Sequence, residues 1–195
     1  MITGWVGEKI RLVPLDRERH FENALRWLND PEVTQWTLMG DLPLTRLMEE
    51  DYFGRVSRPN ETDVAFAVET REEPEEHIGF AGIHQISFRH GTGVTGTIIG
   101  RRGLWNRGFG TDAIAVRTRY AFEVLGLRML YSEVLAENVG ALRALQRSGY
   151  REVGRQPQKY WKRGAYRDVV LLALPRDEWR ALPKDAHGRV APPAG

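Results

Sequence analysis

The stretch of residues 95–120, TGTIIGRRGLWNRGFGTDAIAVRTRY, decides how this chain folds. Its β-branched start predicts a strand, and the glycines that follow predict a turn. From Thr111 onward the apolar residues recur at helical spacing, which predicts a helix. A glycine-rich turn before a helix leaves backbone N–H groups unpaired at the positive end of the helix dipole. The stretch therefore predicts an anion site, and phosphates are the usual ligands of such sites.

The composition favours one soluble domain and excludes several classes of function. The length of 195 residues fits a single domain, and 28 basic residues nearly balance 26 acidic ones, which disfavours a nucleic-acid partner. The absence of cysteine excludes disulfides and thiolate metal sites. The start of the chain shows no signal-peptide pattern, and no apolar run is long enough to span a membrane. We therefore expect a cytoplasmic protein with no membrane partner.

Hydrophobic periodicity and turn residues divide the whole chain into alternating strands and helices. We expect strands at residues 9–14, 63–70, 77–88, 95–99, 130–135, 150–161 and 165–173. Helices are expected at residues 17–28, 45–56, 111–125, 138–148 and 176–182, with residues 32–43 irregular. The polar, Pro/Gly-rich residues 184–195 are expected to form a disordered tail after a domain of residues 1–183. The core order βααβββαβαββ predicts an α/β fold with one mixed sheet.

Three short motifs follow one another on the expected elements. They are Trp105-Asn106-Arg107-Gly108-Phe109-Gly110, Asn138-x-x-Ala141-x-x-x-Leu145-x-x-x-Gly149-Tyr150 and Gly164-Ala165-Tyr166-Arg167-Asp168. Together they resemble the GNAT superfamily of acyl-CoA-dependent N-acetyltransferases, over roughly residues 9–179. The turn that begins with Trp105 resembles the branch of ribosomal-protein N-terminal acetyltransferases. The Gly108-x-Gly110 pair is not a dinucleotide fingerprint, because no third glycine and no downstream ribose-binding acid are in place.

The resemblance implies a three-layer domain and acetyl-CoA as the co-substrate. Its central, mostly antiparallel twisted sheet would be splayed between the fourth and fifth strands, with a bulge at residues 98–100 facing the thioester oxygen. The implied cofactor-binding residues are Ile98, Ile99, Gly100, Arg102, Trp105, Asn106, Arg107, Gly108, Phe109, Gly110, Thr111 and Asn138. Plainer roles also fit: turn glycines, a helix N-cap at Asn138, solvated arginines at 101 and 102, and core packing of Trp105 and Phe109.

Proton transfer is the open part of this interpretation. The family's usual acid positions hold Leu145 and Ala141, and its usual strand glutamate is absent. Water, Tyr131 or Tyr160 remain as acids, although a thiol of pKa ~8.5 leaves acceptably as thiolate. His84 and Glu133 are the candidate bases, directly or through a water. Either is more often a structural or surface residue. The histidine spacing shows no metal pattern, so we expect no metal.

The sequence therefore predicts acetyl transfer from acetyl-CoA to a primary amine by direct attack in a ternary complex. The acceptor would lie between residues 32–43 and the last hairpin, near Trp36, Tyr160 and Tyr166. It could be a protein N-terminal amine, a polyamine, an amino sugar or an aminoglycoside-like drug, and acids such as Asp41 would hold a cationic amine. The alternative is a catalytically impaired acyl-CoA sensor or interaction module on the same fold. A homodimer is compatible with the apolar loop.

Overall fold

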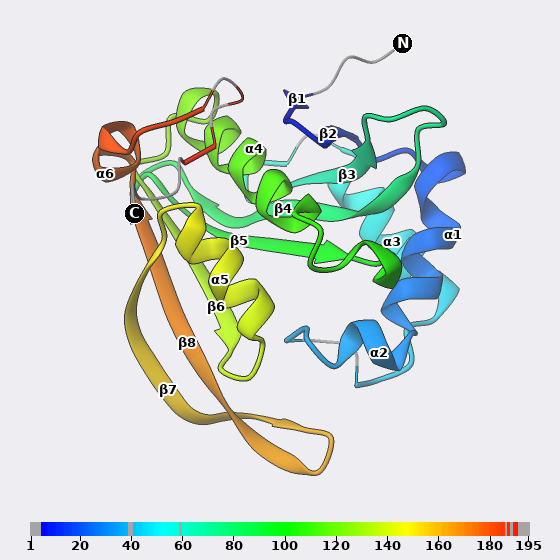
Figure 1. Cartoon of the computed structure of the whole chain (residues 1–195). Helices are drawn as coiled ribbons and strands as arrows, with labels where there is room; N and C mark the ends of the chain where they lie inside the picture. The colour runs from blue at the N-terminus through cyan, green and yellow to red at the C-terminus, as the bar shows by residue number, and fades with distance from the viewer. Residues whose placement is uncertain (1–4, 39–40, 59, 186, 188, 191–195) are drawn as a thin grey trace.

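The computed structural model describes residues 5–38, 41–58, 60–185, 187, 189 and 190. One eight-stranded sheet has the order β1-β2-β3-β4-β5-β6-β8-β7 (Figure 1). Its strands are β1 (Trp5–Val6), β2 (Ile10–Pro14), β3 (Val64–Thr70), β4 (His77–Ser87), β5 (Thr92–Ile99), β6 (Met129–Leu135), β7 (Arg151–Lys162) and β8 (Ala165–Pro175). The helices are α1 (Arg17–Leu28), α2 (Pro31–Thr34), α3 (Arg46–Val56), α4 (Phe109–Glu123), α5 (Val139–Arg147) and α6 (Arg176–Ala181), with a 3₁₀ turn at Arg102–Leu104.

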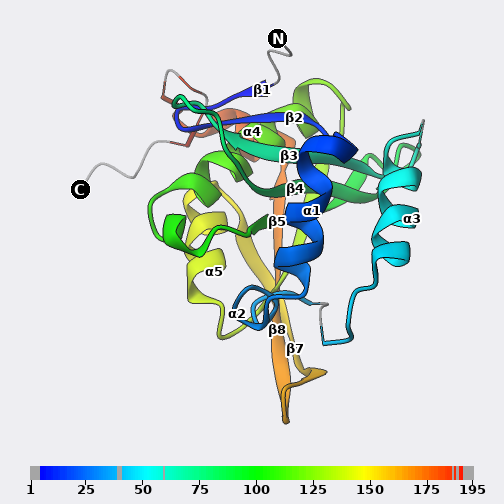
Figure 2. The ribbon, with the colours of Figure 1, turned by 90° about the vertical axis from the view of Figure 1, so that its right-hand side faces the viewer.

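Helices cover both faces of the sheet, which confirms the three-layer α/β fold. Helices α4 and α5 lie on one face, whereas α1 and α3 lie on the other (Figure 2). Two buried clusters pack the sheet against α4: one centres on Ile83, Phe122 and Leu172, and the other on Ile10, Val68 and Val116. A smaller cluster of Phe21, Ala24 and Phe53 joins α1 to α3. Within the described part of the chain, no helix is both long and apolar enough to cross a membrane.

Helix α2 corrects the expectation that residues 32–43 are irregular. Asp30 begins this short helix by accepting a hydrogen bond from the Glu32 N–H at 2.9 Å, and Pro31 occupies the first helical position. Both residues are preferred at those positions, because they satisfy or remove N–H groups that the helix cannot pair. Residues 39 and 40 of the same segment lie outside the described residues.

The sheet is splayed between β5 and β6, as expected. These strands pair in parallel only from Thr92 to Val94, opposite Met129 to Tyr131. At the point of separation the Thr95 hydroxyl donates to the Tyr131 carbonyl at 3.0 Å, and the Ser132 hydroxyl donates to the Thr95 carbonyl at 3.2 Å. Side chains thus replace the backbone ladder at Thr95, and a gap opens beyond it.

The bulge expected at residues 98–100 lies at the end of that range instead of within it, because the N–H groups of Gly100 and Arg101 both donate to the Ile78 carbonyl. The pairing of β4 with β5 is regular from Ile83 opposite Thr95 to Gly79 opposite Ile99, and its irregularity lies between His84 and Ser87. The Gly100 N–H donates to the Ile78 carbonyl at 2.9 Å, so this N–H continues the ladder and does not face the gap. The Trp27 ring lies directly over Gly100, where an added Cβ would come within 2.0 Å of it.

Asp112 fixes the start of α4 to the sheet. Its fully buried carboxylate accepts the N–H groups of Glu8, Lys9 and Ile10 at 3.1, 2.7 and 3.0 Å. Gly7 permits this approach, because an added Cβ would lie 2.4 Å from the carboxylate. An acid in the first turn also complements the helix dipole. The turn that precedes α4 is therefore held firmly beside β2.

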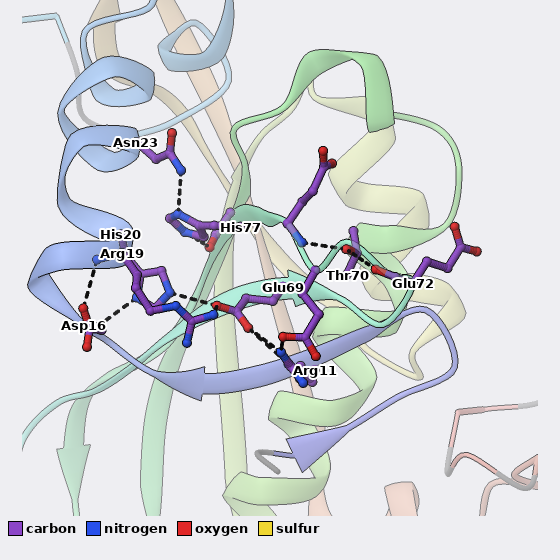
Figure 3. A network of polar contacts seen from close by, with 12 residues as sticks. Arg11, Asp16, Arg19, His20, Asn23, Glu69, Thr70, Glu72 and His77 are labelled. Atoms are coloured by element: carbon purple, nitrogen blue, oxygen red, sulfur yellow. Dashed lines mark hydrogen bonds and ion pairs between the residues drawn. The ribbon is translucent and has the colours of Figure 1, made fainter. Parts of the chain in front are cut away.

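A buried polar network joins α1 to β2, β3 and β4 (Figure 3). Glu69 accepts hydrogen bonds from Arg11, Arg19 and His20, at 3.1, 2.6 and 3.0 Å. The Asp16 N–H donates to Nδ1 of His20, so the Nε2 of His20 carries the proton that Glu69 accepts. The wall of the molecule that carries Trp27 is thereby fixed to the sheet.

Part of the segment expected to be a disordered tail is ordered. Lys184 forms a β-bridge with Val190, and its ammonium donates to the Trp179 and Leu182 carbonyls near the end of α6. Arg189 pairs with Asp185 at 2.6 Å. These polar contacts involve residues 184, 185, 189 and 190 of the expected tail, and the remaining residues of that segment, apart from His187, lie outside the described residues.

Candidate active site

The turn before α4 has the geometry of an anion site. Asn106 and Gly108 adopt left-handed backbone angles, with φ of 60° and 88°, which asparagine and glycine tolerate best. The first helical hydrogen bond runs from the Asp112 N–H to the Gly108 carbonyl, at 3.0 Å. The N–H groups of Phe109, Gly110 and Thr111 are therefore left over at the positive end of a 15-residue helix.

Four cations lie near this turn: the sequence indicated Arg101, Arg102 and Arg107 but did not indicate Lys9. Lys9 was missed: its ammonium lies 5.7 Å from the Phe109 ring centre, and its Cε would be 3.6 Å from a Cβ placed on Gly108. Arg107 is exposed within the turn. Arg102 faces Asp30 at 3.7 Å, and Arg101 pairs with Glu76. No local pattern reveals Lys9, because about 100 residues separate it from the turn.

Trp105 and Asn138 both make structural contacts in the site. The Trp105 ring N–H donates to the Ile99 carbonyl at 2.6 Å, which closes the end of β5. Asn138 is the N-cap of α5, accepting the Ala141 N–H at 3.1 Å, and its amide donates to the Trp36 carbonyl at 3.2 Å. Asn138 therefore joins α5 to the segment that follows α2.

The edge of β5 that faces the gap is defined by the pairing with β4. Backbone groups alternate in direction along an antiparallel strand. Because the Gly100 N–H points at Ile78 of β4, the even-numbered residues of β5 face β4 and the odd-numbered ones face β6. Thr95 is the last of these odd-numbered residues whose backbone is hydrogen-bonded to β6, through its carbonyl and the Ser132 hydroxyl. The next backbone N–H groups on the gap edge therefore belong to Thr97 and Ile99.

The three candidate catalytic residues share one face of the sheet. Val94 is opposite His84 on β4 and Tyr131 on β6, so these side chains lie on the same face, and Glu133 follows two residues along β6. It is the face that carries α1 and α3, because Ile83 on the opposite face packs into the α4 cluster. Gly96 is exposed between them. The structure thus brings together residues nominated separately from the sequence.

His84 has the arrangement of an oriented base. Its Nδ1 lies 2.9 Å from Oδ1 of Asp63, which fixes the tautomer that leaves Nε2 as an acceptor. Nε2 lies above the strands, 2.6 Å from a Cβ placed on Gly82 and 4.0 Å from one on Gly96. Partial burial alone would raise the pKa of Asp63, but hydrogen bonds from His84 and Thr62 lower it below the ordinary value. Asp63 is therefore a carboxylate at neutral pH.

Glu133 is less suited to act as a base. Its carboxylate pairs with the Lys159 ammonium at 2.6 Å, and this hydrogen bond raises the pKa of Lys159. Tyr131 is 40% exposed on the same face. Among the described residues, no group of three or more histidines or acids is placed to hold a metal ion.

A cleft lies between the segment around α2 and the tip of the β7–β8 hairpin. One cavity of about 650 Å³ has mainly apolar walls, which include Leu28, Pro31, Leu42, Pro43 and Trp161. A smaller hollow of about 140 Å³ lies beside Trp36, Leu135, Glu137, Lys162, Arg163 and Arg167. Both sit where the sequence placed the acceptor.

The aromatic residues expected around the acceptor divide between the two faces of the hairpin. Tyr166 is 61% exposed and packs edge-on against Trp161, with ring centres 4.9 Å apart. Tyr160 is opposite Arg167, so it lies on the other face from the Trp161–Tyr166 pair. Trp161, which lines the larger cavity, was missed, although its alternation with Tyr160 along the strand signals a second aromatic face.

The two walls of the cleft are joined by charged contacts. The Lys162 side chain is only 4% exposed, and its ammonium lies 3.0 and 3.1 Å from the two carboxylate oxygens of Asp41. Arg163 donates to the Thr34 hydroxyl at 3.1 Å and approaches Asp41 at 3.7 Å. The hairpin tip is therefore docked onto the segment that leads from α2 to α3.

Comparison with known proteins agrees with this geometry. Residues 9–151 match the family model of the acetyltransferase (GNAT) domain. The uncharacterized N-acetyltransferase p20 of Bacillus licheniformis is 25% identical over 169 residues, which cover 84% of this chain and 93% of that protein. The spermidine N-acetyltransferase of Vibrio cholerae, solved in complex with CoA and spermine, is similar in structure, with a TM-score of 0.79 and 20% identity over 87% of this chain and 96% of that one.

A GCN5-related N-acetyltransferase from Brucella melitensis also shares the fold. It has a TM-score of 0.72 and 24% identity over 97% of this chain and 91% of that one. The family match alone spans well over half of the chain. The chain therefore belongs to the GNAT family of acetyl-CoA-dependent N-acetyltransferases.

Proposed function

We propose that this protein acetylates the N-terminal amine of a peptide or protein by direct attack on acetyl-CoA in a ternary complex. One observation carries the proposal: a single strand, β5, joins the anion-binding turn, the splayed gap and the face that holds His84. The phosphates of acetyl-CoA would lie on the N–H groups of residues 109–111, with Lys9 beside them. The acyl end would then enter the gap and meet the amine on the His84 face.

The residues supply each step of the transfer. Asp63 holds His84 in the tautomer whose Nε2 takes a proton from the incoming ammonium, and it stabilises the imidazolium that results. The neutral amine then forms the C–N bond as the C–S bond breaks. The departing thiolate needs little help, since a thiol of pKa ~8.5 is a good leaving group. Tyr131, exposed on the same face, would protonate the thiolate, and its phenolate would take the proton that the nitrogen releases as the amide forms.

The charges of the cleft favour a monoamine over a polyamine. A polyamine needs carboxylates for its second ammonium, but the two acids that line the described hollows are already paired, Asp41 with Lys162 and Glu137 with Arg167. Glu133 is likewise paired with Lys159. The apolar walls of the larger cavity suit a side chain next to the amine. The spermine bound by the Vibrio cholerae enzyme does not transfer to this chain, because 20% identity supports the fold alone. The motifs at residues 105–110 and 164–168 agree with a peptide acceptor.

Calorimetry followed by an amine panel tests this function. Titration with acetyl-CoA should give one site, and released thiol should then be measured with peptides of varied N-terminal residue, spermidine, an amino sugar and an aminoglycoside. We expect turnover with at least one free N-terminal peptide and none with the same peptide already acetylated.

Two results would contradict the proposal. Preferential turnover of spermidine would replace the peptide with a polyamine. Binding of acetyl-CoA without turnover on any amine would favour the alternative, a catalytically impaired sensor.

A further inference from the structure

Arg117, in the middle of α4, is a buried cation with neutral partners. It is 1% exposed. Its Nη1 donates to the Gly96 carbonyl at 2.9 Å and to the Thr97 hydroxyl at 2.6 Å, and its Nη2 reaches the Tyr150 hydroxyl at 3.4 Å. Its Nε is buried without a partner. Among the described residues no carboxylate lies within ion-pair distance of this guanidinium.

Burying the Arg117 guanidinium among neutral partners costs stability, which suggests that the charge has a functional role. Removing a guanidinium from water is expensive, and neutral acceptors return only part of that cost. Arg117 occupies a helix face between Val116 and Thr118, both buried, where an apolar side chain would fill the space without a charge. Locally unfavourable choices of this kind tend to mark functional sites.

The contact with Gly96 reaches the gap through one peptide unit. The Gly96 carbonyl and the Thr97 N–H belong to the same peptide and point in opposite directions across the strand. The carbonyl points toward β4, so the Thr97 N–H points into the gap between β5 and β6. A charged donor on the carbonyl polarises the peptide and strengthens its N–H as a donor, because hydrogen bonds in a chain are cooperative.

We propose that Arg117 is a positioning residue that polarises the Gly96–Thr97 peptide, so that the Thr97 N–H donates to the thioester carbonyl oxygen. This inference rests on the proposed acetyl-CoA site. Thr97 is the first residue on the gap edge beyond the tie at Thr95, and Gly96 lies beneath the His84 ring. Ile99, the other residue on this edge, has its carbonyl closed off by Trp105. The acyl carbon would thus lie level with the base.

The charge on Arg117 then acts most strongly while the transfer proceeds. As the amine attacks, the thioester oxygen gains negative charge, and the Thr97 N–H stabilises it; when the C–S bond breaks, the charge leaves on the thiolate. A preorganised donor of this kind lowers the barrier without tightening the binding of substrate. The hydroxyl contact to Thr97 holds the peptide in register with the guanidinium.

Infrared spectroscopy of bound acetyl-CoA, labelled with ¹³C at the acetyl carbonyl, tests the inference. In the wild-type protein we expect the carbonyl band at lower frequency than in free acetyl-CoA. In Arg117→Met the band should move back toward the free value, kcat should fall about tenfold and the Kd for acetyl-CoA should stay unchanged. Arg117→Lys keeps the charge, so its band frequency and its kcat should lie between those of the wild type and Arg117→Met.

The matched control is Arg119→Met on the same helix. Arg119 bonds the carbonyls of Val6 and His187, away from β5, so its loss should move neither the band nor kcat. If Arg117→Met does not fold, Thr97→Val takes its place, since it removes one anchor of the guanidinium and keeps the N–H. An unmoved carbonyl band in the folded variants, or equal losses of kcat and affinity, would overturn the inference. A wild-type protein that binds no acetyl-CoA would instead overturn the proposed function.

Discussion

At the scale of single residues, the pair His84–Asp63 supports the strongest catalytic prediction. His84→Gln removes the accepting nitrogen, so we expect kcat to fall by roughly 100-fold with the affinity for acetyl-CoA unchanged. Asp63→Asn should cost roughly tenfold, because it weakens the hold on the Nδ1 tautomer. Steady-state kinetics of the wild type and of both variants, with the amine and acetyl-CoA varied in turn, measure these losses.

The control for this prediction is His90→Gln, since His90 is exposed at the tip of the β4–β5 connection. Full activity in His84→Gln would mean that Glu133 or water acts as the base.

The sequence could nominate His84 but not its orienting partner, because Asp63 lies 21 residues away and meets it only across the sheet. The position of Lys9 beside the turn and the contacts of Arg117 could not be predicted from the sequence for the same reason. Residue types are visible in a sequence, whereas their pairings depend on the fold.

At the scale of elements, the turn before α4 carries a prediction about cofactor binding. Gly108→Val should weaken acetyl-CoA binding tenfold or more, because a β-branched residue at a φ of 88° is strained and would block the approach of the phosphates. The variant should still fold, since its Cβ would meet only Lys9 at 3.6 Å. Calorimetric titration measures the affinity.

Gly103→Val is the matched control for Gly108→Val: it lies in the same connection, no atom comes within 4 Å of its added Cβ, and its φ is not positive. Equal affinity in Gly108→Val and Gly103→Val would mean that the phosphates of acetyl-CoA do not bind at this turn.

The strand, turn and helix of residues 95–120 could be predicted from the sequence because their signals are local. The two-residue β1 and the four-residue α2 are too short to show a period. The splay was expected only by resemblance, since the divergence of β5 and β6 depends on tertiary contacts at Thr95.

At the scale of the whole molecule, the network at α1 ties global stability to pH (Figure 3). His77 accepts from Asn23 at Nδ1 and donates to the Gly79 carbonyl at Nε2, so the folded protein holds it neutral. Burial and the neighbouring His20 lower its pKa from 6.5 to about 3. Between those values the unfolded chain binds a proton that the folded protein does not. The free energy of unfolding therefore falls as the pH drops below 6.5, and this contribution is complete only near pH 3.

His77→Gln removes this titration and should flatten the acid side of the stability curve. The variant should be less stable than the wild type at pH 7, because it loses ring contacts with Trp27 and Phe80. By pH 4.5 the difference should narrow by about 2 kcal/mol, somewhat less than the full linkage for two pH units, since the ring is only partly buried. Urea unfolding at a series of pH values measures the difference, with His90→Gln as the exposed control. A constant difference between His77→Gln and the wild type across this range would mean that other groups of the network, such as Glu69 with its arginines, carry the acid sensitivity.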